Sequence, residues 1–521
     1  MIRPGGDARR AAGRLCLVDF SGTDPSARIE RLIADGGIAG AVLFRKNVAS
    51  VPQVAALTAA LQRIARQAGT PPVWVSIDHE GGAVNRFVPI AHDSTTAPSP
   101  TPLPSAMALG AAGDPALARL AGCVAGRELR ALGVNLNFAP VLDVNNNPAN
   151  PVIGARAFGD SPALVEALGL SYIEGLQSAG VGAAAKHFPG HGDVTVDSHL
   201  ALPRVNHGAD RLEAVELAPF AAAVRADVAA VMTAHVVFPG LDPTGVSATM
   251  SGPILRGILR ERWGYRGLIC SDSLSMRAIV DHYGVGDAAV SAVRAGCDLL
   301  LALGPDALQD EVMEHLALAI ERGDIPGDRL AETMRRLHEA ASRWGIGAAP
   351  HAALAEAVAT EEHAAIARRI AEAAVTLVRD RAGMIPLKAT RVGVVTVAPV
   401  LGDDTTPAFA PWLRRYHPAA LEIPADDPAD ASDAVIAVTC TRGTPASSQV
   451  TTIREIHRRL GARLIVLAAG DPYDLLQFPE VPAYLVTYGP DGPSLDAAAR
   501  VLVGLIRSRG RLPVALPGCT A

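Results

Sequence analysis

Residues 186–199 read Lys186-His-Phe-Pro-Gly-His-Gly-Asp-Val-Thr-Val-Asp-Ser-His199, and these fourteen residues include three histidines, two aspartates and a lysine. They follow a short apolar run at 181–185, Val-Gly-Ala-Ala-Ala, which predicts a buried strand. Pro189, Gly190 and Gly192 indicate a loop directly after that strand. Because loops on a rigid scaffold carry function, this density of titratable side chains predicts a strand that presents a catalytic loop.

The same unit, an apolar run followed by a helical pattern, recurs between residues 13 and 344. Its strand candidates are 15–20, 39–44, 73–77, 134–138, 181–185, 228–233, 268–270 and 299–303. Strands that alternate with helices predict a parallel sheet, and about eight of them over this length predict a TIM-type (β/α)8 barrel. A doubly wound open sheet is the alternative. It needs a glycine-rich phosphate turn after its first strand, whereas residues 21–25 read Ser-Gly-Thr-Asp-Pro.

Ionisable residues follow the third to the seventh of these strands: Asp78, Asp143, Lys186 with His187, His235 and Asp272. A barrel gathers its catalytic groups at the carboxyl ends of its strands. Strand and helix propensities give no reason for ionisable groups at so many such positions. We therefore predict that these loops form one site at the carboxyl end of the barrel.

A second series of strands and helices follows the barrel. Residues 1–345 are predicted to form the barrel, the Ala-rich stretch 346–365 a linker, and residues 366–521 a smaller α/β sandwich domain. The strand candidates of this domain are 375–378, 392–397, 434–438, 464–467 and 484–487, and its helical patterns include 448–460 and 494–506.

The composition argues against several classes of function. The chain has 521 residues and a net charge of −6, with no basic block, so no nucleic-acid partner is expected. Its six cysteines lack metal-ligand spacing and are expected to be reduced. Neither a signal core nor an apolar run of about 20 residues is present, so we expect a cytoplasmic protein without a membrane partner. The oligomeric state is not predictable from these features.

The stretch at 186–199 resembles the signature of glycoside hydrolase family 3, in the NagZ-like branch of β-N-acetylglucosaminidases. Its Asp-Ser-His ending separates this branch from the β-glucosidases of the family. Ser271-Asp-Ser-Leu-Ser-Met276 resembles the family's nucleophile motif, and the stretches 471–474 and 510–514 resemble its C-terminal α/β sandwich domain. The resemblance implies a retaining glycosidase that spans almost the whole chain.

Three residues are implied to perform the chemistry. The resemblance assigns Asp272 as nucleophile and His199 as general acid/base, oriented by Asp197. Glycoside cleavage needs a proton donor at the leaving oxygen and a carboxylate at the anomeric carbon. An imidazole titrates near neutral pH and can both donate and accept a proton, so His199 suits the role. The alternatives are that Asp272 caps the next helix and that Asp197 and His199 merely cap a helix.

The resemblance also implies a set of sugar contacts: Asp78, Arg86, Arg156, Lys186 and His187. A carboxylate accepts hydrogen bonds from hydroxyls, while Arg and Lys donate to hydroxyl or acyl oxygens. The two arginines have surface salt bridges as their alternative role. His191 and His235 either hold the structure or line the pocket. We predict no metal and no cofactor, because each His and carboxylate has a role without them.

The sequence thus predicts an exo-β-N-acetylglucosaminidase that hydrolyses small soluble glycosides such as cell-wall (peptidoglycan) fragments. One alternative is a phosphorylase that uses phosphate in place of water. An alternative of another class is a sugar-binding module that kept the fold and lost the chemistry.

Overall fold

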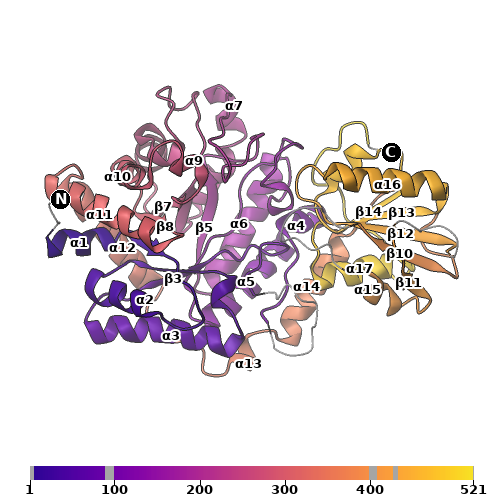
Figure 1. The fold of residues 1–521 in the computed structure, drawn as a ribbon, viewed down its shortest axis with the longest axis horizontal. Helices are drawn as coiled ribbons and strands as arrows, with labels where there is room; N and C mark the ends of the chain where they lie inside the picture. The colour runs from indigo at the N-terminus through magenta and orange to yellow at the C-terminus, as the bar shows by residue number, and fades with distance from the viewer. Residues whose placement is uncertain (1–4, 88–98, 398–407, 426–431, 520–521) are drawn as a thin grey trace.

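Eight strands close into a parallel barrel in sequence order, with β1 hydrogen-bonded to both β2 and β8. They are β1 Cys16–Val18, β2 Gly40–Leu43, β3 Trp74–Ile77, β4 Leu136–Asn137, β5 Gly182–Phe188, β6 Ala230–Thr233, β7 Leu268–Ser273 and β8 Leu299–Ala302. The computed structural model describes residues 5–87, 99–397, 408–425 and 432–519, and Figure 1 shows the barrel on the left. The predicted (β/α)8 barrel is confirmed.

Helices surround the barrel (Figure 1). They are α1 Gly6–Gly13, α2 Ala27–Arg31, η1 Leu32–Gly36, η2 Arg45–Asn47, α3 Val51–Ala68, α4 Ala106–Ala112, α5 Pro115–Ala131, η3 Gly154–Arg156, α6 Pro162–Ser178, α7 Ala209–Ala214, α8 Ala218–Arg225, η4 Ala248–Met250, η5 Pro253–Arg262, α9 Arg277–Val280, α10 Val285–Ala295, α11 Asp306–Arg322, α12 Gly327–Arg343 and α13 Leu354–Ala357. Alternate strand residues face opposite sides. In β2, the side chains of Ala41 and Leu43 pack in an apolar cluster with residues of these helices. Val42, between them, packs in a second cluster with Trp74 and Leu136 of other barrel strands.

The C-terminal domain contains a six-stranded sheet in the order β11-β10-β12-β13-β14-β9. Its elements are β9 Thr376–Asp380, β10 Val392–Thr396, α15 Ala410–Arg414, β11 Ala420–Glu422, β12 Ala434–Thr439, α16 Ser447–Leu460, η6 Gly461–Arg463, β13 Leu464–Ala468, η7 Pro472–Gln477, β14 Ala483–Val486 and α17 Gly492–Leu502. The helix α14 Glu361–Ala374 leads into this domain from the barrel. The predicted α/β sandwich is confirmed.

Apolar side chains on both faces of this sheet explain its helix layers. On β12, Val435 and Ala437 pack in the same cluster as Ile453 of α16, while Ile436 packs in the cluster that contains Leu495 of α17. A sheet buried on both faces has continuous apolar strands, which is why these runs were readable in the sequence. Within the described ranges, no helix is long and apolar enough to cross a membrane.

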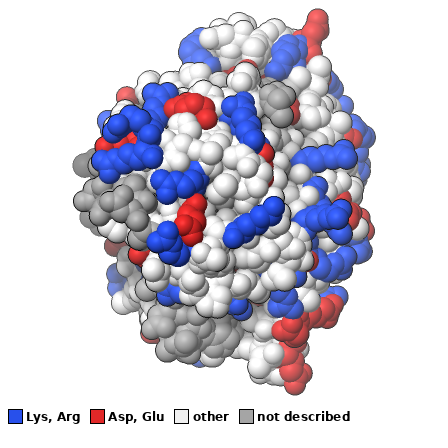
Figure 2. Space-filling model, turned by 90° about the vertical axis from the view of Figure 1, so that its right-hand side faces the viewer, with Lys and Arg blue, Asp and Glu red and all other residues white. Residues whose placement is uncertain are grey.

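Two features of this sheet were not predicted from the sequence. β9 pairs with β14 in the antiparallel direction, which an apolar pattern cannot reveal. β11 was not predicted, because it is a three-residue edge strand whose Leu421 is 63% exposed. Figure 2 looks onto this end of the molecule, where Lys and Arg side chains are scattered among uncharged ones.

The barrel and the C-terminal domain share a packed boundary. Met107 and Ala108 of α4 are fully buried in the same apolar cluster as Val395 and Tyr484 of the C-terminal domain. The hydroxyl of Ser105, the residue before α4, donates to the carbonyl of Tyr488 at 2.7 Å. The short helix α4 therefore belongs to the barrel in sequence and to both domains in packing.

Candidate active site

The ionisable groups predicted from the strand ends meet at the carboxyl end of the barrel. Parallel β3 to β7 end there side by side, in sequence order. The pairing register shifts in β5 between Ala185 and Phe188, and again in β7 between Cys270 and Ser273. Such irregularities re-aim side chains next to active sites. Here they coincide with the positions of Lys186, His187 and Asp272.

Lys186 forms the centre of a buried network of charges. Its side chain is 2% exposed, and Nζ lies 2.8 Å from Oδ1 of Asp78 and 2.5 Å from Oε1 of Glu80. Oδ2 of Asp78 lies 3.3 Å from Nη2 of Arg86. Burial opposes ionisation of Asp78, but the positive charges of Lys186 and Arg86 hold the pKa of that carboxyl below its usual value. Asp78 is therefore an ionised acceptor at neutral pH.

Arg156 joins this network through Glu80. Its Nε and Nη2 donate to the two carboxylate oxygens of Glu80 at 2.9 and 2.8 Å, a bidentate geometry that fixes the guanidinium plane. Burial opposes ionisation of Glu80, but Arg156 and Lys186 more than offset it and lower its pKa. The predicted contacts Asp78, Arg86, Arg156 and Lys186 thus form one network, and Glu80 joins its two halves.

His187 is held by Asp143, which is fully buried. Oδ2 of Asp143 lies 2.7 Å from Nδ1 of His187, and Oδ1 accepts the backbone N–H groups of His187 and His191 at 3.1 and 2.6 Å. Burial opposes ionisation of Asp143, but the charge and hydrogen bond of His187 lower its pKa. Because a carboxylate only accepts, Nδ1 of His187 carries a proton. Nε2 of His187 lies 3.4 Å from Nη2 of Arg156.

Asp197 and His199 form a hydrogen-bonded pair on the loop after β5. Oδ1 of Asp197 lies 2.8 Å from Nδ1 of His199 and accepts its backbone N–H at the same distance. This hydrogen bond raises the pKa of His199, and burial opposes the shift less strongly. The His199 side chain is 60% exposed, and no described residue bonds to its Nε2. The imidazole is oriented at one nitrogen and open to a substrate at the other.

Asp272 lies within β7 near its carboxyl end, whereas the sequence predicted a shorter strand that ends just before it. Its Oδ1 accepts the backbone N–H of Ser273 at 2.6 Å. Burial opposes ionisation, but nearby His187, His235 and the Ser273 amide lower the pKa of Asp272 below its usual value. His199 also contributes to this lowering, so the two groups lie within electrostatic reach of each other. Asp272 is thus a partly exposed, ionised carboxylate, and an ionised carboxylate is what a glycosidase nucleophile requires.

The two histidines left open by the sequence are both buried and have structural contacts. Nε2 of His191 lies 2.9 Å from the hydroxyl of Ser198, between the two members of the Asp197–His199 pair. Burial lowers the pKa of His191 to about 4, so it is neutral. His235 lies 2.8 Å from the Thr249 hydroxyl and 3.0 Å from the carbonyl of Ser273. Each histidine thus supports a neighbour of a predicted catalytic residue.

Asn150 fastens the catalytic loop. Its Nδ2 donates to the carbonyls of His191 and Gly192 at 2.8 and 2.9 Å, and its Oδ1 accepts two backbone N–H groups near η3. A Cβ on Gly192 would lie 1.8 Å from the carbonyl oxygen of Val144, so only glycine permits this close approach. The chain after β4 thereby fixes the start of the loop that carries His199.

The sequence-based set of site residues was incomplete. Glu80 and Asn150 were not selected, and Asp143 was noted only as a strand-end group. The signal was present for two of them: Glu80 lies two residues after Asp78, and Asp143 follows β4. Asn150 has no such signal, because its role depends on a backbone contact that only the fold reveals.

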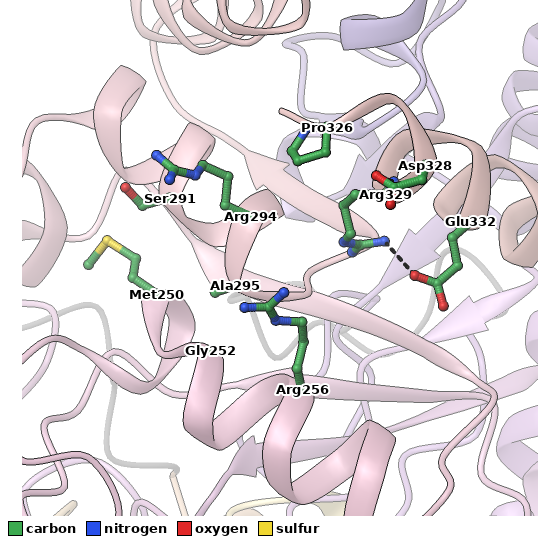
Figure 3. A pocket seen from close by; sticks show the side chains of 10 residues that line it. All are labelled: Met250, Gly252, Arg256, Ser291, Arg294, Ala295, Pro326, Asp328, Arg329 and Glu332. Atoms are coloured by element: carbon green, nitrogen blue, oxygen red, sulfur yellow. Dashed lines mark hydrogen bonds and ion pairs between the residues drawn. The ribbon is translucent and has the colours of Figure 1, made fainter. Parts of the chain in front are cut away.

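A separate pocket lies outside this site. It has a volume of about 760 Å³ and is lined by Met250, Gly252, Arg256, Ser291, Arg294, Ala295, Pro326, Asp328, Arg329 and Glu332 (Figure 3). Arg329 contacts Asp298, which directly precedes β8, so the pocket reaches toward the amino end of the barrel strands. None of the predicted catalytic or sugar-binding residues lines it.

Comparisons with known proteins show the family to which this fold belongs. The family described as "Glycosyl hydrolase family 3 N terminal domain" matches residues 9–340. A solved family 3 β-N-acetylglucosaminidase from Paenibacillus sp. FPU-7 is 36% identical, with a TM-score of 0.91 over 98% of both chains. "Beta-hexosaminidase A" of Pseudoalteromonas piscicida is 31% identical over 98% of this chain and 93% of its own length. "Beta-hexosaminidase" of Xylella fastidiosa strain M23 is 38% identical, over 57% of this chain and 85% of its own length.

Proposed function

The chain belongs to glycoside hydrolase family 3, and from this premise we propose that it is a retaining exo-β-N-acetylglucosaminidase. It is a glycoside hydrolase of the β-hexosaminidase kind, similar to proteins named β-hexosaminidase and β-N-acetylglucosaminidase. The observation that carries the mechanism is the 2.8 Å hydrogen bond between Asp197 and His199, within electrostatic reach of the ionised Asp272. Glycoside cleavage needs a general acid/base, and this pair supplies one.

In the first step, a carboxylate oxygen of Asp272 attacks the anomeric carbon of the sugar. The bond between that carbon and the glycosidic oxygen breaks, and Nε2 of His199 gives its proton to the departing oxygen. The aglycone leaves as an alcohol, and the sugar is bound to Asp272 as an ester. Asp197 favours this step because it raises the pKa of His199 and thereby the protonated fraction.

In the second step, water attacks the anomeric carbon while the neutral His199 accepts a proton from it. The carbon–Asp272 bond breaks, the carboxylate is restored, and the sugar leaves with its original anomeric configuration. The acid of the first step is the base of the second, so one imidazole performs both transfers.

Five residues are proposed to bind the sugar: Asp78, Arg86, Arg156, Lys186 and His187. Asp78 is an acceptor for hydroxyl groups, while Lys186 and Arg156 donate to hydroxyl or acyl oxygens. Their mutual bonds support this role, since each side chain is fixed before a substrate arrives. We propose small soluble N-acetylglucosaminides, such as cell-wall fragments, as the substrates.

Asp272→Asn tests the mechanism on an aryl β-N-acetylglucosaminide. The change is nearly isosteric and removes the nucleophile, so we expect turnover to fall by about three orders of magnitude or more. The melting temperature should not fall, because a partly buried charge is removed and the Ser273 N–H keeps an acceptor. Turnover near the wild-type rate in the folded variant would exclude Asp272 as nucleophile.

Phosphate is the alternative acceptor, and the imidazole acid/base favours it. A carboxylate base would repel an incoming anion by roughly 4 kcal/mol at 4 Å and an effective dielectric of about 20, whereas neutral His199 would not. Turnover in rising phosphate, followed by phosphorus NMR, distinguishes the two acceptors. Water predicts free N-acetylglucosamine at every phosphate concentration, while a phosphorylase predicts a sugar 1-phosphate.

A further inference from the structure

A turn of the C-terminal domain bonds directly to the catalytic end of the barrel. Asp471 follows β13 and is 2% exposed. Its two carboxylate oxygens accept hydrogen bonds from different domains. Its Oδ2 accepts the backbone N–H of Gly443 in its own domain at 2.8 Å. Its Oδ1 accepts the backbone N–H of Ala155 in η3 of the barrel at 2.7 Å. Ala155 directly precedes Arg156, which binds Glu80 in the active site.

The backbone of η3 is fitted closely to this carboxylate. Gly154 has a φ of +45°, and a Cβ on it would lie 2.1 Å from Oδ2 of Asp471. A residue with a side chain would therefore displace either η3 or the turn. The close fit shows that the contact constrains the position of the backbone from which Arg156 projects.

The same turn bonds to the connection between β4 and α6 at a second point. Nδ2 of Asn145 donates to the hydroxyl of Tyr473 at 2.6 Å. Asn145 lies two residues after Asp143, which binds His187. One turn of the C-terminal domain thus bonds at two points to the connection between β4 and α6, which carries both Asp143 and Arg156.

We propose that Asp471 is a positioning residue: the C-terminal domain fixes the η3 backbone through it, so that Arg156 is held where the sugar binds. The proposal rests on the proposed role of Arg156 in sugar binding. A hydrogen bond from a backbone N–H to a carboxylate is stronger than one between neutral groups, and it is directional. Residues that orient binding groups in this way set the precision of the site, even when they never touch the substrate.

The test uses Asp471→Asn in the full chain. The amide keeps one acceptor oxygen, but it turns an NH2 group toward one of the two N–H donors and removes the charge. Displacing a sugar-binding group costs affinity, so we expect kcat/KM to fall about 10- to 100-fold, mainly through a higher KM. Wild-type kcat/KM would overturn the proposal.

Asp474→Asn is the matched control. Asp474 lies in the same turn and is equally buried, and burial raises the pKa of both carboxyls to about 6. Its partners, the hydroxyls of Thr439 and Tyr484, both belong to the C-terminal domain. We expect Asp474→Asn to lower the melting temperature while kcat/KM stays within about two-fold of wild type. An equal rise of KM in both variants would assign the effect to domain stability and overturn the proposal.

A double-mutant cycle with Arg156→Ala separates this inference from the function on which it rests. If Asp471 acts through Arg156, adding Asp471→Asn to Arg156→Ala should cause little further loss. Losses that multiply would overturn the inference alone. An unchanged KM in Arg156→Ala would overturn the sugar-binding role of Arg156, and the inference with it. If Asp471→Asn does not fold, Gly154→Ala displaces the same contact from the barrel side and should raise KM in the same way.

Discussion

The choice of a histidine as acid/base has a measurable consequence at the scale of one residue. His199→Ala removes the proton donor, so cleavage should slow most for substrates whose leaving group needs protonation. Activated aryl leaving groups should still transfer the sugar to Asp272, after which the intermediate accumulates because no base activates water. A Brønsted series of aryl N-acetylglucosaminides measures this, and equal losses for good and poor leaving groups would indicate a structural role.

The Asp197–His199 hydrogen bond also predicts a pH shift. Asp197 raises the pKa of His199, and the first step needs the protonated imidazole. Removing this acceptor in Asp197→Ala lowers the pKa of His199, so the protonated fraction disappears at a lower pH. The alkaline limb of kcat/KM against pH should therefore move to lower pH. A limb that stays in place would show that another group controls it.

At the scale of elements, the catalytic loop after β5 depends on the side chain of Asn150, which lies in the connection after β4. Asn150→Asp keeps the acceptor for the N–H groups of Val152 and Ile153 and replaces the donor to His191 and Gly192 with a carboxylate oxygen. An acceptor facing two carbonyls repels them, so we expect kcat to fall about 10- to 100-fold as the loop shifts.

Asn147→Asp is the control for this change. Its Nδ2 lies 3.5 Å from the carbonyl of Val194, a long contact, and its Oδ1 accepts the N–H of Ala149. The substitution adds the same charge to the same loop without breaking a short bond to the catalytic loop. Similar losses in both variants would attribute the effect of Asn150→Asp to charge alone.

The elements themselves were largely predictable from the sequence, for a physical reason. Each barrel strand is buried on both faces, so it appears in the sequence as an apolar run. The ionisable residues that follow five of these strands indicate the catalytic end of the barrel. The antiparallel direction of β9 and the short edge strand β11 leave no such pattern. Within the site, Asp272 was selected because residues 271–276 follow a strand and resemble the family's nucleophile motif. Asn150 and Asp471 were not, since each acts on backbone groups distant in the sequence.

At the scale of the whole molecule, the boundary between the domains is also part of the catalytic end. The barrel helix α4 places Met107, Ala108 and Ala111 in the apolar cluster of the C-terminal domain. Asp471 and Tyr473 bond to the connection between β4 and α6 of the barrel across the same boundary. Domain order in the sequence cannot reveal such contacts, because they join segments about 300 residues apart.

This shared boundary predicts how the barrel behaves alone. A chain truncated after residue 365 exposes Met107, whose burial stabilises the fold by about 1.5–3 kcal/mol, together with the neighbouring alanines. We expect a lower melting temperature and aggregation, measured by calorimetry and light scattering. Met107→Gln should reduce the aggregation of the truncated chain, because it makes the exposed face polar.

The same truncated variant separates stability from positioning. Met107→Gln should keep the truncated chain from aggregating, so that its activity can be measured. It does not restore the contact between Asp471 and the N–H of Ala155. We therefore expect the residual enzyme to keep the alkaline limb set by His199 and Asp197, both barrel residues, while its KM is raised as in Asp471→Asn. A truncated barrel with the wild-type KM would show that the C-terminal domain only covers apolar surface.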